Sequence, residues 1–561
     1  MSDFSAAKDR GHVSRRDFLA TTGTGIAALA AAGCAPAEQD GVKAGETGTG
    51  TGGSAAGKMS DNVPRAPFDT FRDWIGALEA HGLLMRFERM DQDAYHTTGL
   101  FFRATDKFGM YETPAMRFDN VKINGEWIKG PVIANHQGHW NADALIWGID
   151  PVPGDHYATY RLAKAHMSEM LGRNRGKWPE IPPVEVTRDK ALCKEVVVTG
   201  DDIDITRFAF LKTNPADVDR YVNTGSVFMH DVELGPNFGT YRCQFKGPRK
   251  LGMNSSPVHQ GYKMFEAARA RGETSVPVSI VVGQDPVVWL LSSAPVVRRK
   301  EGVPMDELAI AGGMRGKAIE TVKSETSDIQ VPAHAEMVIE GVVPLDEGTE
   351  REGPFGEMFG YLGPANPENL WVNITAITHR RDPWIMNAYT GMQRGMVTAP
   401  LDAVYESFLR PRIPNFVDYH MAQDVMGVVC MSIDKKEAGE GMKSGLTIAR
   451  SHPFAKIVIV VDKDINVYDR TAVVFAMGSR WQPHPATTII EEAFGIGTDP
   501  SQLVERETSK IVIDATRQLP GEGGRAEFPE LNRALLEKGA PNVFAEVDAL
   551  YGQVLRDFRR V

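Results

Sequence analysis

The sequence predicts a multidomain protein of mixed α+β and α/β class. At the usual domain size, its 561 residues correspond to about three domains. Short β-branched runs dominate from about residue 185 to 385, and strand and helix patterns alternate from about 415 to 520. Together with a helix-containing stretch before residue 185, these patterns indicate a small N-terminal α/β part, a β-rich middle domain and a C-terminal α/β domain.

The composition argues against several classes of protein. Charged residues make up 24% and hydrophobic residues 42% of the chain, which is typical of globular proteins. Acidic residues outnumber basic ones, 73 to 62, and the net charge of −11 argues against nucleic acid as a partner. The cysteines lack both C-x-x-C spacing and the density of a disulfide framework; they are Cys34, Cys193, Cys243 and Cys430.

Residues 1–34 are typical of a twin-arginine export signal. Ser14-Arg15-Arg16-Asp17-Phe18-Leu19 precedes an Ala/Gly/Thr run, 20–33, that is too short and too weakly apolar to span a membrane. The alternative is an amphipathic N-terminal helix that contains the arginine pair by chance. The signal predicts that the twin-arginine machinery exports the folded protein to the periplasm, with any cofactor inserted beforehand.

A lipid anchor at Cys34 is the one membrane attachment that the sequence suggests. Ala31-Ala32-Gly33-Cys34 resembles a lipoprotein cleavage box, although alanine stands at 31 where leucine is usual. Ordinary cleavage nearby is the alternative. Residues 35–66 are predicted to form a disordered tether, because 41–58 consist mainly of Gly, Thr, Ser and Ala, which cannot bury enough surface to fold.

Local patterns predict the elements of the folded part. Phe71, Trp74, Ile75 and Leu78 fall at i, i+3, i+4 and i+7, which predicts an amphipathic helix that Gly82 ends. Strands are expected at 194–198, 276–282, 337–343 and 456–461, and helices at 402–409 and 471–477. The predicted parts are an N-terminal α/β part at 67–185, the β-rich domain at 186–398, a linker helix at 399–413 and the C-terminal domain at 414–561.

Two carboxylates, Glu352 and Glu357, flank the turn sequence Gly353-Pro354-Phe355-Gly356. A helix or regular strand would not place i and i+5 on one face, but a turn can fold both side chains into one pocket. Burial and like charge would then raise the pKa of one carboxyl group and make it a proton donor. Taken alone, the pair has an alternative interpretation as two solvated loop glutamates.

Further segments occur in a fixed order around this pair. They are Asn237-Phe238-Gly239-Thr240-Tyr241-Arg242, Pro257-Val258-His259, Glu307 ahead of 311–316, and, more widely, 68–74, 276–279, 331–336, 475–483 and 514–522. As an ordered series they resemble the UbiD-type decarboxylases, which use prenylated FMN. The resemblance covers nearly all of the chain after the tether. It implies a split β-barrel flavin-binding domain at 186–398 and a C-terminal α/β oligomerisation domain.

The resemblance also implies a metal site. Asn237, His259 and Glu307 match the positions that hold a divalent metal against the cofactor phosphate, with Mn²⁺ as the expected ion and K⁺ as an additional candidate. Amide oxygen, imidazole and carboxylate are suitable ligands for Mn²⁺. Taken alone, His259 would be interpreted as a structural histidine. Some members of the family have a different residue at that position.

The cofactor and catalytic residues follow from the same likeness. Residues matching those that contact the prenylated flavin are Thr240, Tyr241, Arg242, Asn254, Ser255, Ser256, His259 and Gln260. Arg242, Glu352 and Glu357 match the catalytic set. Arg242 would orient the substrate carboxylate, Glu357 would donate the proton that replaces CO₂, and Glu352 would hold Arg242 in place. The segment 399–412 is expected to form a wall of the substrate pocket.

The implied activity is that of a carboxy-lyase. It is the non-oxidative decarboxylation of an aromatic, heteroaromatic or α,β-unsaturated acid, with the reverse carboxylation as an open alternative, through a covalent adduct with prenylated FMN and protonation by a glutamate. The expected assembly is a homodimer or higher homo-oligomer. Two alternatives remain: an exported homologue that binds flavin or an aromatic acid without turnover, and a flavin reductase on a related barrel. The export signal departs from the family, which is cytoplasmic, and favours environmental aromatic acids as substrates.

Overall fold

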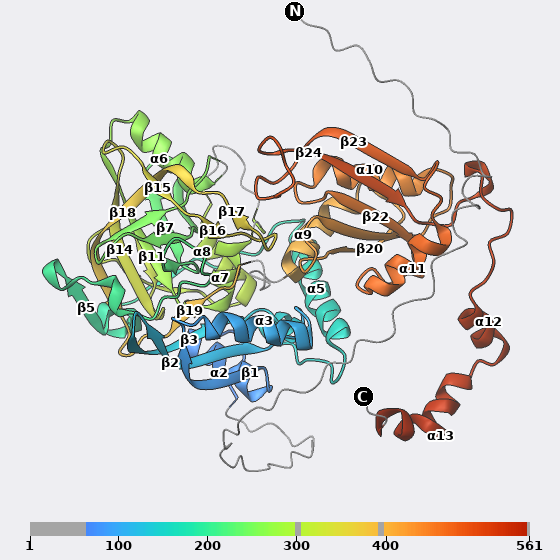
Figure 1. Cartoon of the computed structure of the whole chain (residues 1–561), viewed down its shortest axis with the longest axis horizontal. Coiled ribbons are helices and arrows are strands. Elements are labelled where there is room, and N and C mark those ends of the chain that lie inside the picture. The colour runs from blue at the N-terminus through green and yellow to red at the C-terminus, as the bar shows by residue number, and fades with distance from the viewer. Residues whose placement is uncertain (1–62, 258, 295, 298–304, 391–397, 558–561) are drawn as a thin grey trace, which may run out of the picture. The chain divides into compact units, whose positions relative to one another are not determined.

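The computed structural model describes residues 63–257, 259–294, 296–297, 305–390 and 398–557 (Figure 1). The predicted export signal, the candidate lipid anchor and nearly all of the tether lie outside these residues. No helix within the described ranges is long and apolar enough to cross a membrane.

The N-terminal part consists of a four-stranded sheet and the helices around it. The sheet has the order β1 (Leu84–Asp91), β2 (Ala115–Ile123), β3 (Glu126–Ala134) and β19 (Ile385–Asn387). Its helices are α2 (Phe71–Ala80), α3 (His96–Phe108), α4 (Trp140–Leu145) and α5 (His156–Arg173). The predicted first helix is confirmed as α2, whose apolar stripe is buried. Gly82 follows it with φ +70, a left-handed conformation that glycine adopts without a steric cost.

The middle of the chain forms a ten-stranded sheet, mostly green and yellow in Figure 1. Its main path is β6-β9-β10-β18-β14-β11-β7-β8, with β5 and β15 also paired to β18. The bounds are β5 (Val196–Thr199), β6 (Tyr221–Val222), β7 (Ser226–Asp231), β8 (Gly235–Thr240), β9 (Cys243–Phe245), β10 (Lys250–Met253), β11 (Ser275–Val282), β14 (Met337–Pro344), β15 (Glu350–Glu352) and β18 (Asn366–His379). Among the described strands this path does not close into a barrel.

The predicted strands at 276–282 and 337–343 are confirmed as β11 and β14, which pair antiparallel. The expected strand at 194–198 begins later, at Val196 of β5. Lys194 lies instead at the end of a 3₁₀ turn, where its buried Nζ is 3.2 Å from Oε1 of Glu340 on β14. This buried ion pair draws the lysine out of the extended conformation that the local pattern predicts.

Short elements complete this region. Helices α6 (Gln260–Ala270), α7 (Pro286–Ser293) and α8 (Glu307–Arg315) all contact β8. Two small sheets are formed by β4 (Val184–Glu185), β12 (Glu320–Lys323) and β13 (Gln330–Pro332), and by β16 (Phe355–Gly356) and β17 (Leu362–Gly363).

The C-terminal part contains a five-stranded sheet of order β20-β21-β22-β24-β23. Its strands are β20 (Phe416–Met421), β21 (Val428–Ile433), β22 (Ile457–Asp462), β23 (Thr487–Phe494) and β24 (Glu507–Asp514). Its helices are α10 (Glu440–Ser451), α11 (Arg470–Arg480), α12 (Asn532–Gly539) and α13 (Val543–Asp557). The predicted strand at 456–461 and helix at 471–477 are confirmed as β22 and α11.

Helix α9 (Thr398–Leu409) precedes this sheet and confirms the helical spacing at 402–409. It ends before the predicted limit of 413, since Pro411 has no N–H to continue the helix. A buried lysine on α5 contacts both α9 and the C-terminal sheet. Its Nζ, on Lys164, lies 2.5 Å from Glu406 on α9 and 2.7 Å from Asp418 on β20. The ion pairs fix the C-terminal strands relative to the N-terminal helices.

Candidate active site

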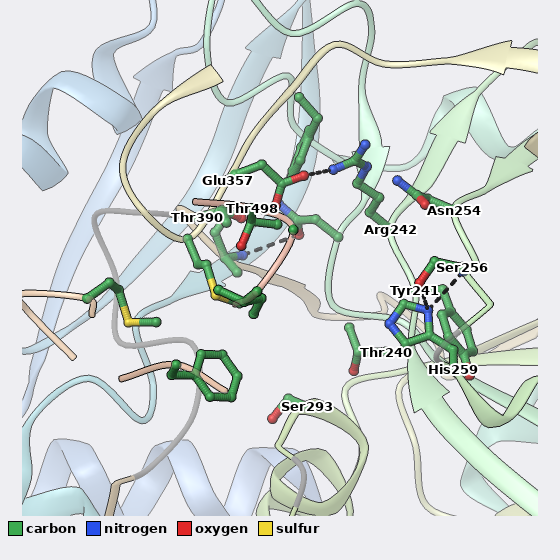
Figure 2. A pocket seen from close by; sticks show the side chains of 18 of the residues that line it. Thr240, Tyr241, Arg242, Asn254, Ser256, His259, Ser293, Glu357, Thr390 and Thr498 are labelled. Carbon is green, nitrogen blue, oxygen red and sulfur yellow. Dashed lines mark hydrogen bonds and ion pairs between the residues drawn. The ribbon is translucent and has the colours of Figure 1, made fainter. Parts of the chain in front are cut away.

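A cavity of about 500 Å³ lies where strands β8–β10 meet segments of the C-terminal sheet (Figure 2). Six of the residues with predicted roles in cofactor binding line it: Thr240, Tyr241, Arg242, Asn254, Ser256 and His259. Ser255 and Gln260 do not line the cavity. Ser255 is buried behind it, with an Oγ that has no hydrogen-bond partner among the described residues, and Gln260 is the first residue of α6.

Arg242 joins both glutamates of the predicted catalytic set. Its Nε and Nη2 donate to the two carboxylate oxygens of Glu352, at 2.9 and 2.8 Å. Its Nη1 donates to Oε1 of Glu357, which Figure 2 shows as the dashed line between the two labelled side chains. Asn254 also donates to Glu352, at 3.1 Å. The structure therefore brings together the three residues that the turn pattern and the family resemblance single out.

The turn between the glutamates explains their convergence. Glu352 ends β15, and Gly353 adopts φ +78, which turns the chain toward the short hairpin of β16 and β17. Glu357 follows β16, and its N–H donates to the carbonyl of Tyr361 at 2.8 Å. Gly363 leaves room for the glutamate, because a Cβ at that position would lie 2.5 Å from Glu357 Cγ. Both carboxylates thus reach one guanidinium although they are five residues apart.

The two carboxylates differ in environment. The Glu352 side chain has no exposed surface and accepts a bidentate pair, whereas 21% of the Glu357 side chain is exposed toward the cavity. Burial raises the pKa of Glu357, the nearby Arg242 opposes this rise, and the charge of Glu352 adds to it. A raised pKa favours the protonated form of the carboxyl group that faces the cavity, and this is the form required of a general acid.

The predicted metal ligands lie at the starts of two helices and on β8. Glu307 is the first residue of α8, and its Oε2 accepts the N–H of Phe238, the neighbour of Asn237, at 3.1 Å. Asn237 is buried, and its Nδ2 has no hydrogen-bond partner among the described residues. The amide oxygen of Asn237 and the carboxylate of Glu307 are oxygen ligands of the kind that suit a hard cation, whereas Nδ2 is a hydrogen-bond donor and would not contact the ion.

His259 fits the metal site less well in this arrangement. It precedes α6, and its Nδ1 accepts the N–H of Ser256 at 3.0 Å. The neutral ring then carries its proton on Nε2, and that nitrogen can ligate a metal only after the proton moves or the ring turns. Within the described residues no group of three or more His, Cys, Asp and Glu side chains is placed to hold a metal ion.

The substrate-side wall is not formed by the segment that the sequence suggested. Among the described residues, no part of 401–412 lines the cavity. Its apolar lining comes instead from Met421 at the end of β20, Met426, Phe454 and Ile496, together with Phe355 and Tyr389. These C-terminal residues carry no local signal of function, because an isolated Met, Phe or Ile in the sequence is typical of any hydrophobic core.

Comparisons with known proteins show the family to which the chain belongs. Residues 184–393 match the family model described as the 3-octaprenyl-4-hydroxybenzoate carboxy-lyase Rift-related domain. Residues 395–515 match the model of the C-terminal domain of the same carboxy-lyase. An uncharacterized protein of Archaeoglobus fulgidus is 31% identical over 373 residues, which is 65% of this chain and 74% of the relative. An uncharacterized protein of Synechocystis is 28% identical, and the match spans 59% of this chain and 66% of that protein.

Solved structures match over a longer part of the chain. The UbiD-class enzyme HmfF from Pelotomaculum thermopropionicum, in complex with FMN, is 28% identical with a TM-score of 0.69, covering 82% of this chain and 97% of that one. The open form of vanillic acid decarboxylase from Sedimentibacter hydroxybenzoicus is 25% identical with a TM-score of 0.71, covering 86% and 99%.

Proposed function

Since the chain belongs to the UbiD family, we propose that it is a non-oxidative carboxy-lyase that uses prenylated FMN. Its substrate is an aromatic, heteroaromatic or α,β-unsaturated carboxylic acid. The observation that carries the proposal is the arrangement of Arg242, Glu352 and Glu357 at the wall of a cavity of about 500 Å³. A cavity of this size accommodates a flavin ring system or a comparable small molecule.

The cavity offers suitable groups for the cofactor. Thr240, Ser256 and Ser293 present hydroxyl groups, and Tyr241 lies behind them with its OH accepting the N–H of Gly261 at 3.2 Å. Similar structures contain FMN and prenylated FMN. When bound, the prenylated flavin supplies the electron sink that loss of CO₂ requires.

The protein side chains then have separate tasks. Arg242 presents a cation to the acid and orients its carboxylate, while the bidentate pair with Glu352 fixes the plane of the guanidinium. Glu357 holds the proton on its carboxyl group and delivers it to the carbon that loses CO₂. Met421, Phe454 and Ile496 exclude water from the opposite wall, which strengthens the electrostatic interactions inside.

The decisive experiment measures CO₂ release by cofactor-loaded protein from a panel of cinnamic, hydroxybenzoic and heteroaromatic acids. Turnover of at least one acid by wild type, with solvent deuterium entering at the vacated carbon, supports the proposal. If the loaded protein binds flavin and releases CO₂ from none, the non-catalytic alternative replaces it. Reduction of an acceptor by a nicotinamide cofactor without CO₂ release would identify the flavin reductase.

We also propose that Asn237 and Glu307 hold a divalent ion, Mn²⁺, near the cofactor phosphate, with His259 as a third ligand once its ring has changed tautomer. The burial of Asn237, whose side chain offers an amide oxygen, and the carboxylate of Glu307, which accepts the N–H of the neighbouring Phe238, support this assignment. K⁺ remains an additional candidate. Metal analysis of the purified protein after desalting, by mass spectrometry, tests which ion is retained.

A further proposal concerns export. We propose that the twin-arginine motif within residues 1–34 directs the mature enzyme to the periplasm, and that Cys34 is a site of lipid attachment. Replacing Arg15-Arg16 by two lysines should leave the precursor in the cytoplasm. Incorporation of labelled palmitate into wild type but not into Cys34→Ser would support the lipid anchor. If neither protein incorporates the label, the anchor is excluded.

We infer that the protein assembles as a homodimer or a higher homo-oligomer through its C-terminal part. Helix α13 supports this inference, because its large apolar side chains are mostly exposed, with Leu550 at 71% and Val554 at 65%. Apolar surface left uncovered on a folded chain is typical of an interface. Light scattering of full-length protein and of a variant that ends at residue 530 tests it, because only the full-length chain should form oligomers.

A further inference from the structure

The charge balance of the cavity points to a second cationic residue with a binding role. All three donor groups of Arg242 that face carboxylates are engaged by Glu352 and Glu357. A flavin phosphate and a carboxylate substrate would both bring negative charge to this site. Among the described residues that line the cavity, Arg506 is the other one with a permanent positive charge.

Arg506 reaches the cavity from the C-terminal sheet, on the loop between β23 and β24. The loop is closed by its own hydrogen bonds: the N–H of Arg506 donates to Gln502 Oε1 at 2.8 Å, and the N–H of Gly495 donates to the carbonyl of Arg506 at 3.0 Å. Lys456 holds the far side of the loop through Asp499 at 2.8 Å. The guanidinium is thus presented on a braced loop, which lowers the entropy lost on binding a ligand.

The guanidinium has only a weak partner in the described structure. Its Nε lies 3.3 Å from Oε1 of Glu505, whose side chain is 74% exposed, while the Arg506 side chain is 29% exposed. An ion pair with so exposed a carboxylate is worth little. The cation is therefore available to a ligand that enters the cavity.

Arg506 shares the cavity with groups suited to binding an anion. His259, Thr240 and Ser256 line the same cavity as Arg506. His259 precedes α6, an 11-residue helix, and the start of a helix attracts anions. Figure 2 shows Thr240, Ser256 and His259 near one another, with Glu357 farther away.

We propose that Arg506 is an oxyanion anchor of the cavity, and that its ligand is the phosphate of the flavin rather than the carboxylate of the acid. The proposal rests on the proposed function, since that function supplies the flavin. It assigns the C-terminal sheet a direct part in holding the cofactor, because the loop between β23 and β24 would contact the phosphate.

Binding of FMN and of riboflavin, which lacks the phosphate, tests the assignment without turnover. Flavin fluorescence is titrated with the full chain purified free of flavin. Arg506→Gln should weaken FMN binding about tenfold or more, the size expected for one charge-assisted hydrogen bond, and leave riboflavin binding within about twofold. Arg506→Lys should recover part of the loss. Glu505→Gln should bind FMN at least as tightly as wild type, because it frees the guanidinium.

Arg103→Gln serves as the matched control, since Arg103 is an exposed arginine paired with Asp106 on α3. An equal loss of FMN and riboflavin binding in Arg506→Gln would overturn the proposal, as would unchanged binding of both. If Arg506→Gln binds FMN as wild type does but has a raised KM for the acid, the phosphate assignment is wrong and Arg506 binds the substrate carboxylate instead. If Arg506→Gln shows the FMN-specific loss but the loaded wild type decarboxylates no acid, the proposed function is wrong while the role of Arg506 in phosphate binding is retained.

Discussion

Arg242 and Glu352 form a two-point ion pair between segments that are 110 residues apart in the sequence. The Nε and Nη2 of the arginine donate to the two oxygens of a carboxylate that has no exposed surface. A buried pair of this kind adds little net stability, because desolvation of both charges offsets their attraction. Its main effect is to fix the orientation of the guanidinium, with Nη1 directed to Glu357.

Glu352→Gln should therefore impair catalysis through Arg242. The variant keeps one acceptor oxygen but loses the charge and half of the bidentate contact, and we expect about 2 kcal/mol less free energy of unfolding. We also expect a higher KM for the acid, because the guanidinium is no longer fixed. Urea denaturation and steady-state kinetics measure the two effects. An unchanged KM would show that Glu352 does not orient Arg242.

Glu357→Gln should abolish proton delivery and leave the fold intact. Turnover should fall by about 10²-fold or more, the usual size of a lost general acid. The assay follows CO₂ release and deuterium incorporation. Glu347→Gln, at an exposed glutamate of the strand connection before β15, is the control and should match wild type. A Glu357→Gln enzyme as active as wild type would exclude Glu357 as the proton donor.

The raised pKa of Glu357 also predicts a pH dependence of stability. Below the ordinary glutamate pKa of 4.5, the carboxyl group is protonated in both the folded and the unfolded chain. The stability that folding gains from burying a neutral rather than a charged group is then fully present. As pH rises through the higher folded pKa, the unfolded chain loses its proton more readily, and this contribution is lost. The free energy of unfolding of wild type relative to Glu357→Gln should therefore decrease from pH 4 to pH 7. A constant difference between the two proteins would contradict the raised pKa.

Glu307→Gln should release the metal and weaken retention of the flavin. A carboxylate ligand to a divalent ion is exchanged for a neutral amide, which lowers the affinity of the site. Metal and flavin contents per chain are measured after desalting, with Glu347→Gln as control. Unchanged metal and flavin contents in Glu307→Gln would show that Glu307 is not a metal ligand.

His136 should make the protein sensitive to acid. It is fully buried, accepts the indole N–H of Trp74 at 3.1 Å, and burial lowers its pKa from 6.5 to about 3. As pH falls below 6.5 the unfolded chain takes up a proton that the folded histidine does not, and stability is lost. Between pH 6.5 and 5 the loss should be about 2 kcal/mol. Urea denaturation of His136→Asn should show a smaller pH dependence than wild type, whereas the exposed His230→Asn should match wild type.

The sequence by itself predicted several local elements, and its resemblance to a family singled out the three residues that the structure brings together at Arg242. The apolar spacing of 71–78 is a short-range property, and it specifies α2 without reference to the rest of the chain. The turn sequence between Glu352 and Glu357 allowed the two carboxylates to converge but was equally compatible with two solvated loop glutamates. The order of the motifs then identified Arg242 as their partner, because the family resemblance supplied a long-range pairing that periodicity does not contain.

The tertiary structure alone decided which C-terminal residues complete the cavity. Met421, Phe454 and Arg506 lie far from Arg242 in the sequence, yet the packing of the C-terminal sheet lets all of them line one cavity. Likewise, the buried Glu340 draws Lys194 out of its predicted strand. Side-chain contacts across such sequence distances depend on how whole sheets pack. A local pattern of apolar and polar residues carries information only about the face that an element buries, and not about its neighbour.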